Sequence, residues 1–425
     1  MALVLAFGIV LLLSVSLSGL AARTVLSTAL LFLASGAILG PGGLGVVNPT
    51  DNTVELLADI ALFTVLFTDG QRANLPALKE NWRLSGRALG LGMPLTMVGI
   101  AIPAHYLVGL DWPTALLLGA ILSPTDPVFA SALVGRSDVP LGLRRLLNVE
   151  SGLNDGLALP FVLIFLATAK HESSHLPVVL AELALGLAVG VGVAVLVALA
   201  WRLPILTAEP RLQPLGPFAI AVVVYATCHM THANPYLAAF AAGSALATLD
   251  HVTAEHFEPF GDLLSEITKF AALLVFGALI TPERISHLGW QEWLLAVLAI
   301  VVVRPVSMLV SLIRTPMPRA EKLTAAWFGP KGFASVVYGL VVLKTGIPEG
   351  ERLFDLIAIT IALSIILHSS TDVPVARKLR IPPADHLPTG VHDPAFDIPD
   401  DRHEDSHGNL PESAPTDRRS QGNSM

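Results

Sequence analysis

Apolar runs long enough to cross a lipid bilayer follow one another along most of the chain. A membrane-spanning helix needs about 20 predominantly apolar residues, and the sequence offers thirteen such segments: 2–20, 23–46, 54–70, 84–110, 112–135, 146–170, 177–201, 215–233, 235–250, 259–280, 289–313, 323–345 and 353–373. Hydrophobic residues make up 53% of the chain and charged residues only 14%, which excludes an ordinary soluble protein. We therefore expect an all-α polytopic membrane protein with about thirteen transmembrane helices in the lipid bilayer. The segment 235–250 is short, so a tilted or re-entrant piece is an alternative there.

Basic residues indicate how this bundle is oriented, because Lys and Arg gather in cytoplasmic loops. The connections that follow odd-numbered segments hold sixteen Lys and Arg residues, whereas those that follow even-numbered segments hold four, namely Lys170, Arg284, Lys344 and Arg352. This asymmetry predicts a plasma-membrane protein with its N-terminus outside the cell and its C-terminus in the cytoplasm. No basic residue precedes the first segment, so we interpret it as an uncleaved span.

Several function classes have no signature in the sequence. The single cysteine, Cys228, excludes an internal disulfide framework, and no clustered Cys/His spacing suggests a structural metal. No GxxxxGK[ST] loop suggests an ATP site. We expect no cofactor, no enzymatic activity and no nucleic-acid partner. The predicted membrane domain covers 1–380, and the tail over 381–425 is rich in Pro, Asp, His and Ser, which is typical of a disordered cytoplasmic segment.

One predicted span, 112–135, carries a polar interruption with the sequence TDP at 125–127. Pro124 and Pro127 remove backbone donors and break the helix near mid-membrane. Free carbonyl groups persist in a membrane only where protein or a water-filled cavity satisfies them, as in the ion sites of transporters. A simple proline kink would explain the prolines but not Asp126, since an ionisable residue at this depth is costly. The pattern therefore favours an ion site at the break.

A second polar cluster opens the next span, with the sequence NVESGLND. Ser151 and Asp155 are four residues apart and share one helix face, while Glu150 and Asn154 share the neighbouring face. Two oxygen ligands therefore point the same way. The alternative is a polar first turn at the membrane surface, where carboxylates suit the helix dipole.

An arginine lies deep within the apolar stretch VVVRPVSMLV. Arg304 would be very costly there without a carboxylate partner. Glu150 is the preferred partner, and we favour a structural or orienting role for the pair over a direct part in transport.

The stretch PKGFAS at 330–335 repeats part of PTDPVFAS at 124–131. The two stretches lie in the fifth and twelfth predicted spans, and an odd separation of seven spans reverses the direction through the membrane, as an inverted-topology repeat predicts. Where two broken helices cross, like dipole ends face each other. Asp126 would then compensate the pair of N-terminal ends, and Lys331 the pair of C-terminal ends.

Four motifs resemble, in order and in the expected spans, those of the monovalent cation/proton antiporters of the sodium/proton exchanger branch, of bacterial or archaeal type. They are TDP at 125–127, ESGLND at 150–155, RP at 304–305 and GPKGFAS at 329–335. The resemblance covers about residues 1–380, and the motifs are highly specific. It implies thirteen helices with an inverted repeat, in which discontinuous helices 5 and 12 cross. It also implies a homodimer that moves its ion by an elevator-like shift of a core domain.

The same resemblance implies a role for each residue of the predicted ion site. Asp155 would bind the cation and the proton in turn, with Asp126, Ser151, Asn154 and the backbone at Thr125 completing the site. The ligands expected for the transported monovalent cation itself are Asp155, Asp126 and Ser151.

Other motif residues would support this site. Glu150 and Arg304 would form the ion pair of the family. Lys331 stands where many relatives carry arginine, and LHSST at 367–371 replaces a more usual His-Gly-x-Thr, which leaves the role of His368 open.

Asp69, in the stretch VLFTDGQR, stands where relatives have an acidic residue near the ion pathway, although an ordinary cytoplasmic helix end is the alternative. Further polar residues of the spans could line a pathway, but an i,i+3 ion pair and interfacial histidines explain them adequately: Asp59, Glu266 with Lys269, and His229 with His232. The tail histidines His386, His392, His403 and His407 are interpreted as solvated.

Competition for one carboxylate would be enough to drive exchange. If a proton and a cation compete for Asp155 and only the loaded forms cross the membrane, no separate energy source is needed. Asn154 stands where the electrogenic branch has a second aspartate, which favours one proton per cation. We therefore predict electroneutral antiport of Na⁺, with Li⁺ as a second substrate, against H⁺. A K⁺/H⁺ antiporter with the same machinery stays an alternative, and a cation-coupled symporter of organic solutes is disfavoured by an aromatic content of 6%.

Overall fold

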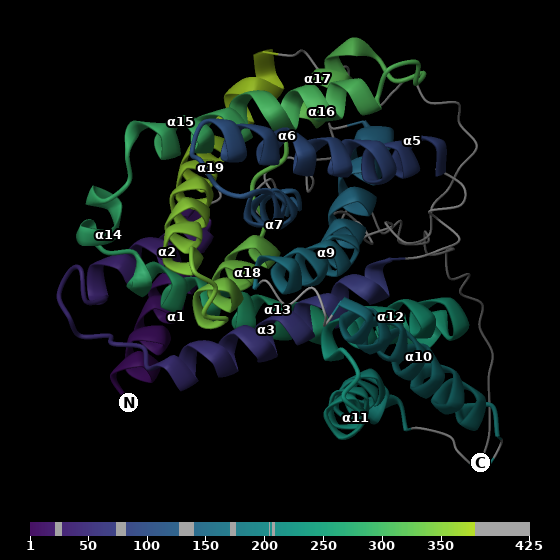
Figure 1. The fold of residues 1–425 in the computed structure, drawn as a ribbon. Coiled ribbons are helices and arrows are strands. Elements are labelled where there is room, and N and C mark those ends of the chain that lie inside the picture. Colours follow the sequence, from purple (N-terminus) through teal and green to yellow (C-terminus); the bar gives the residue numbers. More distant parts are fainter. Residues whose placement is uncertain are drawn as a thin grey trace, which may run out of the picture. The chain divides into compact units, whose positions relative to one another are not determined.

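The structure, a computed structural model, describes residues 1–21, 28–73, 82–126, 140–170, 176–203, 205 and 209–378, and every regular element within them is a helix (Figure 1). The helices up to residue 201 are α1 (Ala2–Ala21), α2 (Thr28–Leu39), α3 (Asp51–Arg72), α5 (Trp82–Arg87), η1 (Ala88–Gly92), α6 (Met93–Tyr106), α7 (Trp112–Leu122), α9 (Leu141–Ala169) and α10 (Leu176–Trp201). The others are η4 (Pro210–Leu212), α11 (Leu215–Thr231), α12 (Pro235–Leu249), α13 (His251–Leu279), α14 (Pro282–Ser286), α15 (Trp290–Leu298), η5 (Ala299–Val303), α16 (Arg304–Ser311), α17 (Arg319–Trp327), α18 (Phe333–Lys344) and α19 (Gly350–Lys378).

Each of the thirteen apolar segments expected from the sequence contains helix. Five helical stretches are long and apolar enough to cross a membrane by themselves: Leu84–Tyr106, Gly142–Ala169, Leu176–Trp201, Trp290–Ser311 and Gly350–Thr371. Other segments form helices that are shorter, such as α12, or that carry more charge, such as α3 and α13. The number of thirteen spans therefore stays a prediction.

Helix α13 begins earlier than its apolar segment, at His251 instead of 259. The cause is a cap, because Asp250 Oδ1 accepts a hydrogen bond from Thr253 N over 3.1 Å and Asp250 Oδ2 accepts one from Thr253 Oγ1 over 2.7 Å. Such a cap satisfies backbone donors of the first helical turn. Hydropathy alone does not detect a helix that starts in polar residues.

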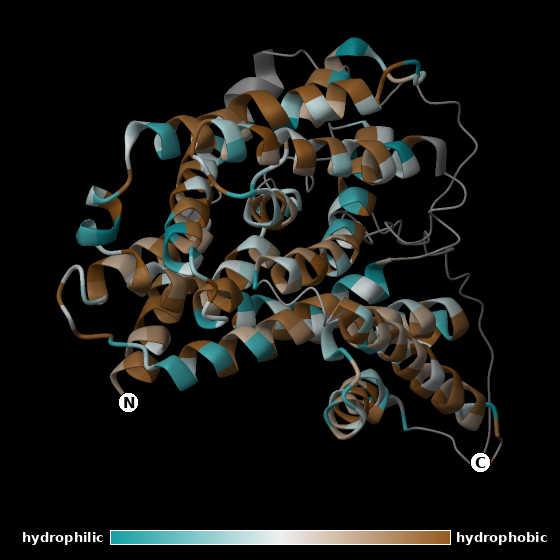
Figure 2. Cartoon of the chain, viewed as in Figure 1, coloured by the Kyte–Doolittle hydropathy of each residue, from teal (hydrophilic) through white to brown (hydrophobic). Residues whose placement is uncertain are grey.

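The outer helices expose large apolar side chains. Leu12 on α1 and Leu196 on α10 are each 69% exposed, and Figure 2 shows hydrophobic residues along most of α10. A soluble protein rarely presents contiguous apolar surface of this kind, whereas a lipid-facing helix requires it. The described helices therefore form a multi-pass membrane protein.

The predicted fourth and eleventh spans share an irregularity. Each contains a π-helical turn, η1 in one and η5 in the other, and each π turn lies just before a proline, Pro94 or Pro305. The two spans pack against each other through α6 and α16 (Figure 1), and Arg87 Nε donates to Ser311 O over 2.7 Å. Two spans that are seven apart and break at matching places are what an inverted repeat predicts.

Helix α3 packs against four other helices. It contacts α12, α13, α9 and α18, so helices distant in sequence converge along its length. Its C-terminal half is buried almost throughout, from Val65 to Gly70.

Candidate functional site

The fifth predicted span breaks at the TDP motif. Helix α7 ends at Leu122, and the chain then runs without helix as far as Asp126. Side chains from outside α7 bond the carbonyl groups that the break leaves free: Lys331 Nζ donates to Leu122 O over 2.5 Å, and Ser335 Oγ donates to Ile121 O over 2.6 Å. Since the C-terminal end of a helix carries partial negative charge, the ammonium of Lys331 lies where the helix dipole favours a cation.

The twelfth predicted span breaks between α17 and α18, and the two breaks cross. Thr125 and Lys331 form an isolated antiparallel β-bridge, and Asp126 N donates to Pro330 O over 3.2 Å. Backbone groups that have lost helical partners thus satisfy one another, as a site within a membrane requires. The rest of the fifth span, from Pro127 on, lies outside the described residues, and the N-terminal end expected to face Asp126 from that side lies there too.

Two glycines of the GPKG sequence allow the close approach at this crossing. A Cβ atom on Gly329 would collide with the guanidinium of Arg304, and a Cβ atom on Gly332 would lie 3.0 Å from Asp126 Cβ. Both contacts are too tight for any larger residue to fit without displacing its neighbour. The motif therefore fixes where Arg304 and Asp126 lie relative to the broken helix.

Asp155 lies on α9 beside the crossing. Its neighbour Asn154 donates from Nδ2 to both Thr125 O and Thr125 Oγ1 over 3.0 Å, and Tyr338 OH donates to Asp155 O over 3.1 Å. The Asp155 residue is 3% exposed, and within the described part of the chain its Oδ1 is buried with no hydrogen-bond partner. Ser151, one turn earlier, is also buried. Because a charged oxygen without a partner is costly away from water, this oxygen is suited to bind a proton or a cation.

Glu150 and Arg304 form a buried ion pair between α9 and α16. Arg304 Nη2 donates to Glu150 Oε1, and the two side chains are 6% and 3% exposed respectively. The expected partner of the buried arginine is therefore the one found. Removal of either charge would leave the other buried and uncompensated.

Asp69 is part of the same buried region and is not an exposed helix end. It lies in the last turns of α3 and is 4% exposed, and its Oδ1 is 3.6 Å from Arg72 Nη1. Arg72 in turn bonds Asp262 Oδ1 on α13 over 2.6 Å. Asp69 also interacts electrostatically with Asp126, which places it near the crossing.

Lys269 on α13 lies at the crossing, although the sequence favoured a local explanation for it over a place on the ion pathway. The i,i+3 pair with Glu266 that the sequence predicts for this lysine is wrong, because Glu266 is exposed while Lys269 Nζ lies 3.5 Å from Asp126 Oδ2. The lysine side chain is only 9% exposed. It also interacts electrostatically with Asp69 and Asp155. The one available signal was a lysine at the edge of a long apolar run.

His368 supports the twelfth-span break from α19. Its Nε2 lies 3.1 Å from Trp327 O, the last carbonyl group of α17, and its Nδ1 lies 2.8 Å from Ser364 O. Ser364 Oγ accepts a hydrogen bond from Lys331 N over 2.9 Å. The departure from the usual family sequence at 367–371 therefore still places a histidine at the break.

The remaining polar residues considered from the sequence lie elsewhere. Asp59 accepts a hydrogen bond from Tyr236 OH over 2.5 Å, and His229 and His232 are exposed. The four tail histidines lie outside the described residues.

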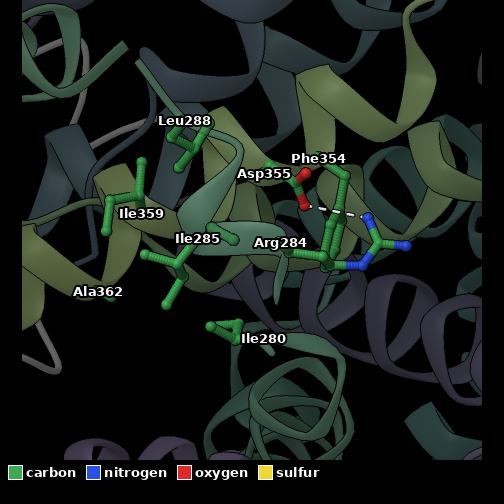
Figure 3. A pocket seen from close by; sticks show the side chains of 9 residues that line it. Ile280, Arg284, Ile285, Leu288, Phe354, Asp355, Ile359 and Ala362 are labelled. Carbon is green, nitrogen blue, oxygen red and sulfur yellow. Dashed lines mark hydrogen bonds and ion pairs between the residues drawn. The ribbon is translucent and has the colours of Figure 1, made fainter. Parts of the chain in front are cut away.

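A small cavity of about 60 Å³ lies apart from this site (Figure 3). Its lining comes from α14, α19 and the residues Ile280 and Leu288 on either side of α14, and it is mostly apolar. Its charged members, Arg284 and Asp355, bond each other over 3.0 Å. None of its residues belongs to the crossing, so it is not the ion site.

A profile of the transmembrane region of sodium/hydrogen exchangers matches residues 9–378 of this chain. Among curated proteins, the K(+)/H(+) antiporter NhaP of Alkalimonas amylolytica is 26% identical over 386 residues, covering 89% of this chain and 67% of that protein. The K(+)/H(+) antiporter NhaP2 of Shewanella sp. (strain ANA-3) is 23% identical over 383 residues, covering 87% of this chain and 66% of that protein. The chain thus spans about two thirds of the length of these relatives.

A solved structure has the same fold. The sodium proton antiporter MjNhaP1 from Methanocaldococcus jannaschii matches with a TM-score of 0.75 at 22% sequence identity, covering 89% of this chain and 99% of that one. The predicted fold class, an all-α polytopic membrane protein, is therefore confirmed.

Proposed function

The chain belongs to the sodium/hydrogen exchanger family, whose members are cation/proton antiporters and not enzymes, and on that premise we propose that it exchanges Na⁺ for H⁺ across the plasma membrane at a ratio of one to one. Asp155 is the carboxylate that carries the exchanged ion. It holds a proton in one loaded form and the cation in the other.

The unpartnered oxygen of Asp155 is the observation that carries this proposal. The oxygen is buried beside two broken helices, yet no hydrogen bond within the described residues compensates its charge. Burial penalises the charged form of a carboxylate, and either a proton or a bound cation relieves that penalty. The two ligands therefore compete for one place, and competition of this kind couples their movements.

The surrounding residues hold the exchange site in shape. Thr125 is fixed by Asn154, and its backbone, with Asp126 and Ser151, supplies further oxygen atoms for a cation. Asn154 is neutral, so it adds no second titratable group on α9 beside Asp155. This composition supports the electroneutral stoichiometry.

Other charged residues support the site without exchanging ions. Glu150 and Arg304 hold α9 against α16, and Lys331 compensates the C-terminal end of α7. Asp69 is buried at the end of α3, and we assign it to the route by which the ion reaches the crossing.

A K⁺/H⁺ antiporter is the second candidate, because both curated relatives described above carry that name. Carboxylate, hydroxyl and carbonyl oxygens bind either ion, so the ligand set does not separate them. Proteoliposomes with an imposed pH gradient, offered Na⁺, Li⁺ and K⁺ in turn, decide between the two. Proton flux with K⁺ alone would replace the sodium proposal by the potassium one.

The test of the exchange site is Asp155→Asn, which keeps size and hydrogen bonding but removes the exchangeable charge. Movement of ²²Na⁺ across the proteoliposome membrane, driven by a pH gradient, should fall to background for both directions of the gradient. Asp59→Asn is the matched control, since it removes a carboxylate from another span without touching the crossing, and it should retain uptake near the wild-type rate. A monodisperse Asp155→Asn protein that exchanges as fast as wild type would refute the proposal.

A further inference from the structure

A lysine lies among the carboxylates of the exchange site. Lys269 reaches from α13 to Asp126, with 3.5 Å between Nζ and Oδ2, and the ammonium lies 5.9 Å from the ring centre of Phe333. Burial of a lysine is costly unless a carboxylate compensates it. The interaction joins a continuous helix, α13, to the broken fifth span.

The charges around Lys269 come from three other elements. Asp69 and Arg72 face it from α3, Asp126 from the fifth-span break, and Asp155 from α9, and all of them interact with its ammonium electrostatically. Three carboxylates thus share one buried cation that the chain itself supplies, with Arg72 at the edge of the group. This resident charge distinguishes the site from a simple acidic cluster.

The ammonium of Lys269 compensates the charge of Asp126 and so lowers the negative charge that this second carboxylate offers to an ion. Within the described residues, no three His, Cys, Asp or Glu side chains converge as a metal-ligand group. Divalent cations such as Ca²⁺ and Mn²⁺ prefer several anionic oxygens. With Asp126 held by Lys269, Asp155 is the one carboxylate of this group that has, within the described residues, a buried oxygen without a hydrogen-bond partner, which suits a single positive charge.

We propose that Lys269 is a specificity-determining residue, an inference that rests on the exchange site proposed above. As a cation that the protein itself holds against Asp126, Lys269 restricts the site to one monovalent ion and excludes divalent ions. Its charge is essential to this role, and its identity as lysine is not. An arginine at the same position would preserve the exclusion, whereas a neutral side chain of similar length would abolish it.

Binding of Mn²⁺ to the purified, detergent-solubilised full-length protein tests this inference without any transport. Mn²⁺ binding, followed by electron paramagnetic resonance, should be about tenfold or more tighter in Lys269→Gln than in wild type, because one compensating charge near the ligands is gone. Lys269→Arg should bind Mn²⁺ as weakly as wild type. Lys344→Gln is the matched control, since it also removes a lysine from a carboxylate, Asp51, but at the surface, and it should change nothing.

The double variant Lys269→Gln/Asp126→Asn guards against misfolding of the single one. It removes both charges of the pair, so it should fold and again reject Mn²⁺. Equal Mn²⁺ affinity in wild type and a folded Lys269→Gln would overturn the inference, and so would tight binding by Lys269→Arg or by the double variant. Absence of ion exchange in wild-type proteoliposomes would instead refute the proposed function, and the two failures are therefore distinguishable.

Discussion

Helix α9 presents two buried carboxylates five residues apart, Glu150 and Asp155, and they differ in what compensates them. Glu150 has Arg304 as a partner, and both side chains are almost fully buried. Asp155 is equally buried but has an oxygen without any hydrogen-bond partner in the described chain. A carboxylate that is paired with a protein side chain has a structural role, whereas a carboxylate without such a partner is available to an ion from solution. The contrast separates the residue that holds α9 in place from the one proposed to exchange ions.

The largest loss of stability should follow from breaking the permanent pair. Glu150→Gln and Arg304→Gln each leave an uncompensated buried charge, which typically costs roughly 3–5 kcal/mol. The double variant should lose less than the sum of the two. Thermal unfolding of all three in detergent measures the cycle, and strictly additive losses would contradict direct pairing.

An intermediate loss is expected when the pair is disturbed without being broken. In Gly329→Ala the new Cβ atom collides with the guanidinium of Arg304, so the arginine must shift away from its position against the twelfth span, at a cost of roughly 1–3 kcal/mol. Gly192→Ala on α10 is the matched control, because a Cβ atom there meets nothing within 4 Å. It should be neutral or slightly stabilising. Equal unfolding temperatures of the two variants would show that the close approach at Gly329 has no energetic importance.

The smallest effect on stability should come from Asp155→Asn, although it is expected to abolish exchange. The substitution removes a buried charge whose Oδ1 accepts no hydrogen bond from the described residues, so stability should stay the same or rise. The same thermal-unfolding measurement applies, made at neutral pH without added sodium or potassium. A loss as large as that of Glu150→Gln would mean that Asp155 has a structural partner, and the contrast between the two carboxylates would disappear.

The sequence predicted those parts of the site in which a residue is energetically costly in its own predicted span. A charge deep in an apolar run requires a partner, which led from Arg304 to Glu150, and two prolines around Asp126 required a break. The same reasoning failed for Lys269, because Glu266, three residues earlier, offered a local partner and concealed the contact with a residue on another span. A partner close in sequence can thus lead to a wrong prediction when the true partner lies on another span.

Helix ends and irregularities were less predictable than helix existence. Hydropathy located the apolar segments but missed the capped polar start of α13 and the π turns within the fourth and eleventh spans. These features depend on single hydrogen bonds and on packing between distant helices. The preference for sodium or potassium was not predictable either, because ligand type alone does not fix the size of the ion.

The π turn η5 ends just before Arg304, and its extra residue has a consequence for direction. An α-helix advances about 100° of rotation per residue, so a one-residue insertion turns every side chain beyond it to a different azimuth. The π turn therefore determines how the following helix is rotated about its axis. As a result, the guanidinium of Arg304 points toward α9 and not toward lipid. A deletion of one residue between 299 and 303 would restore a regular helix and rotate the arginine away from its partner while leaving every chemical group of the site in the sequence. At this position the spacing of residues carries as much information as their identity.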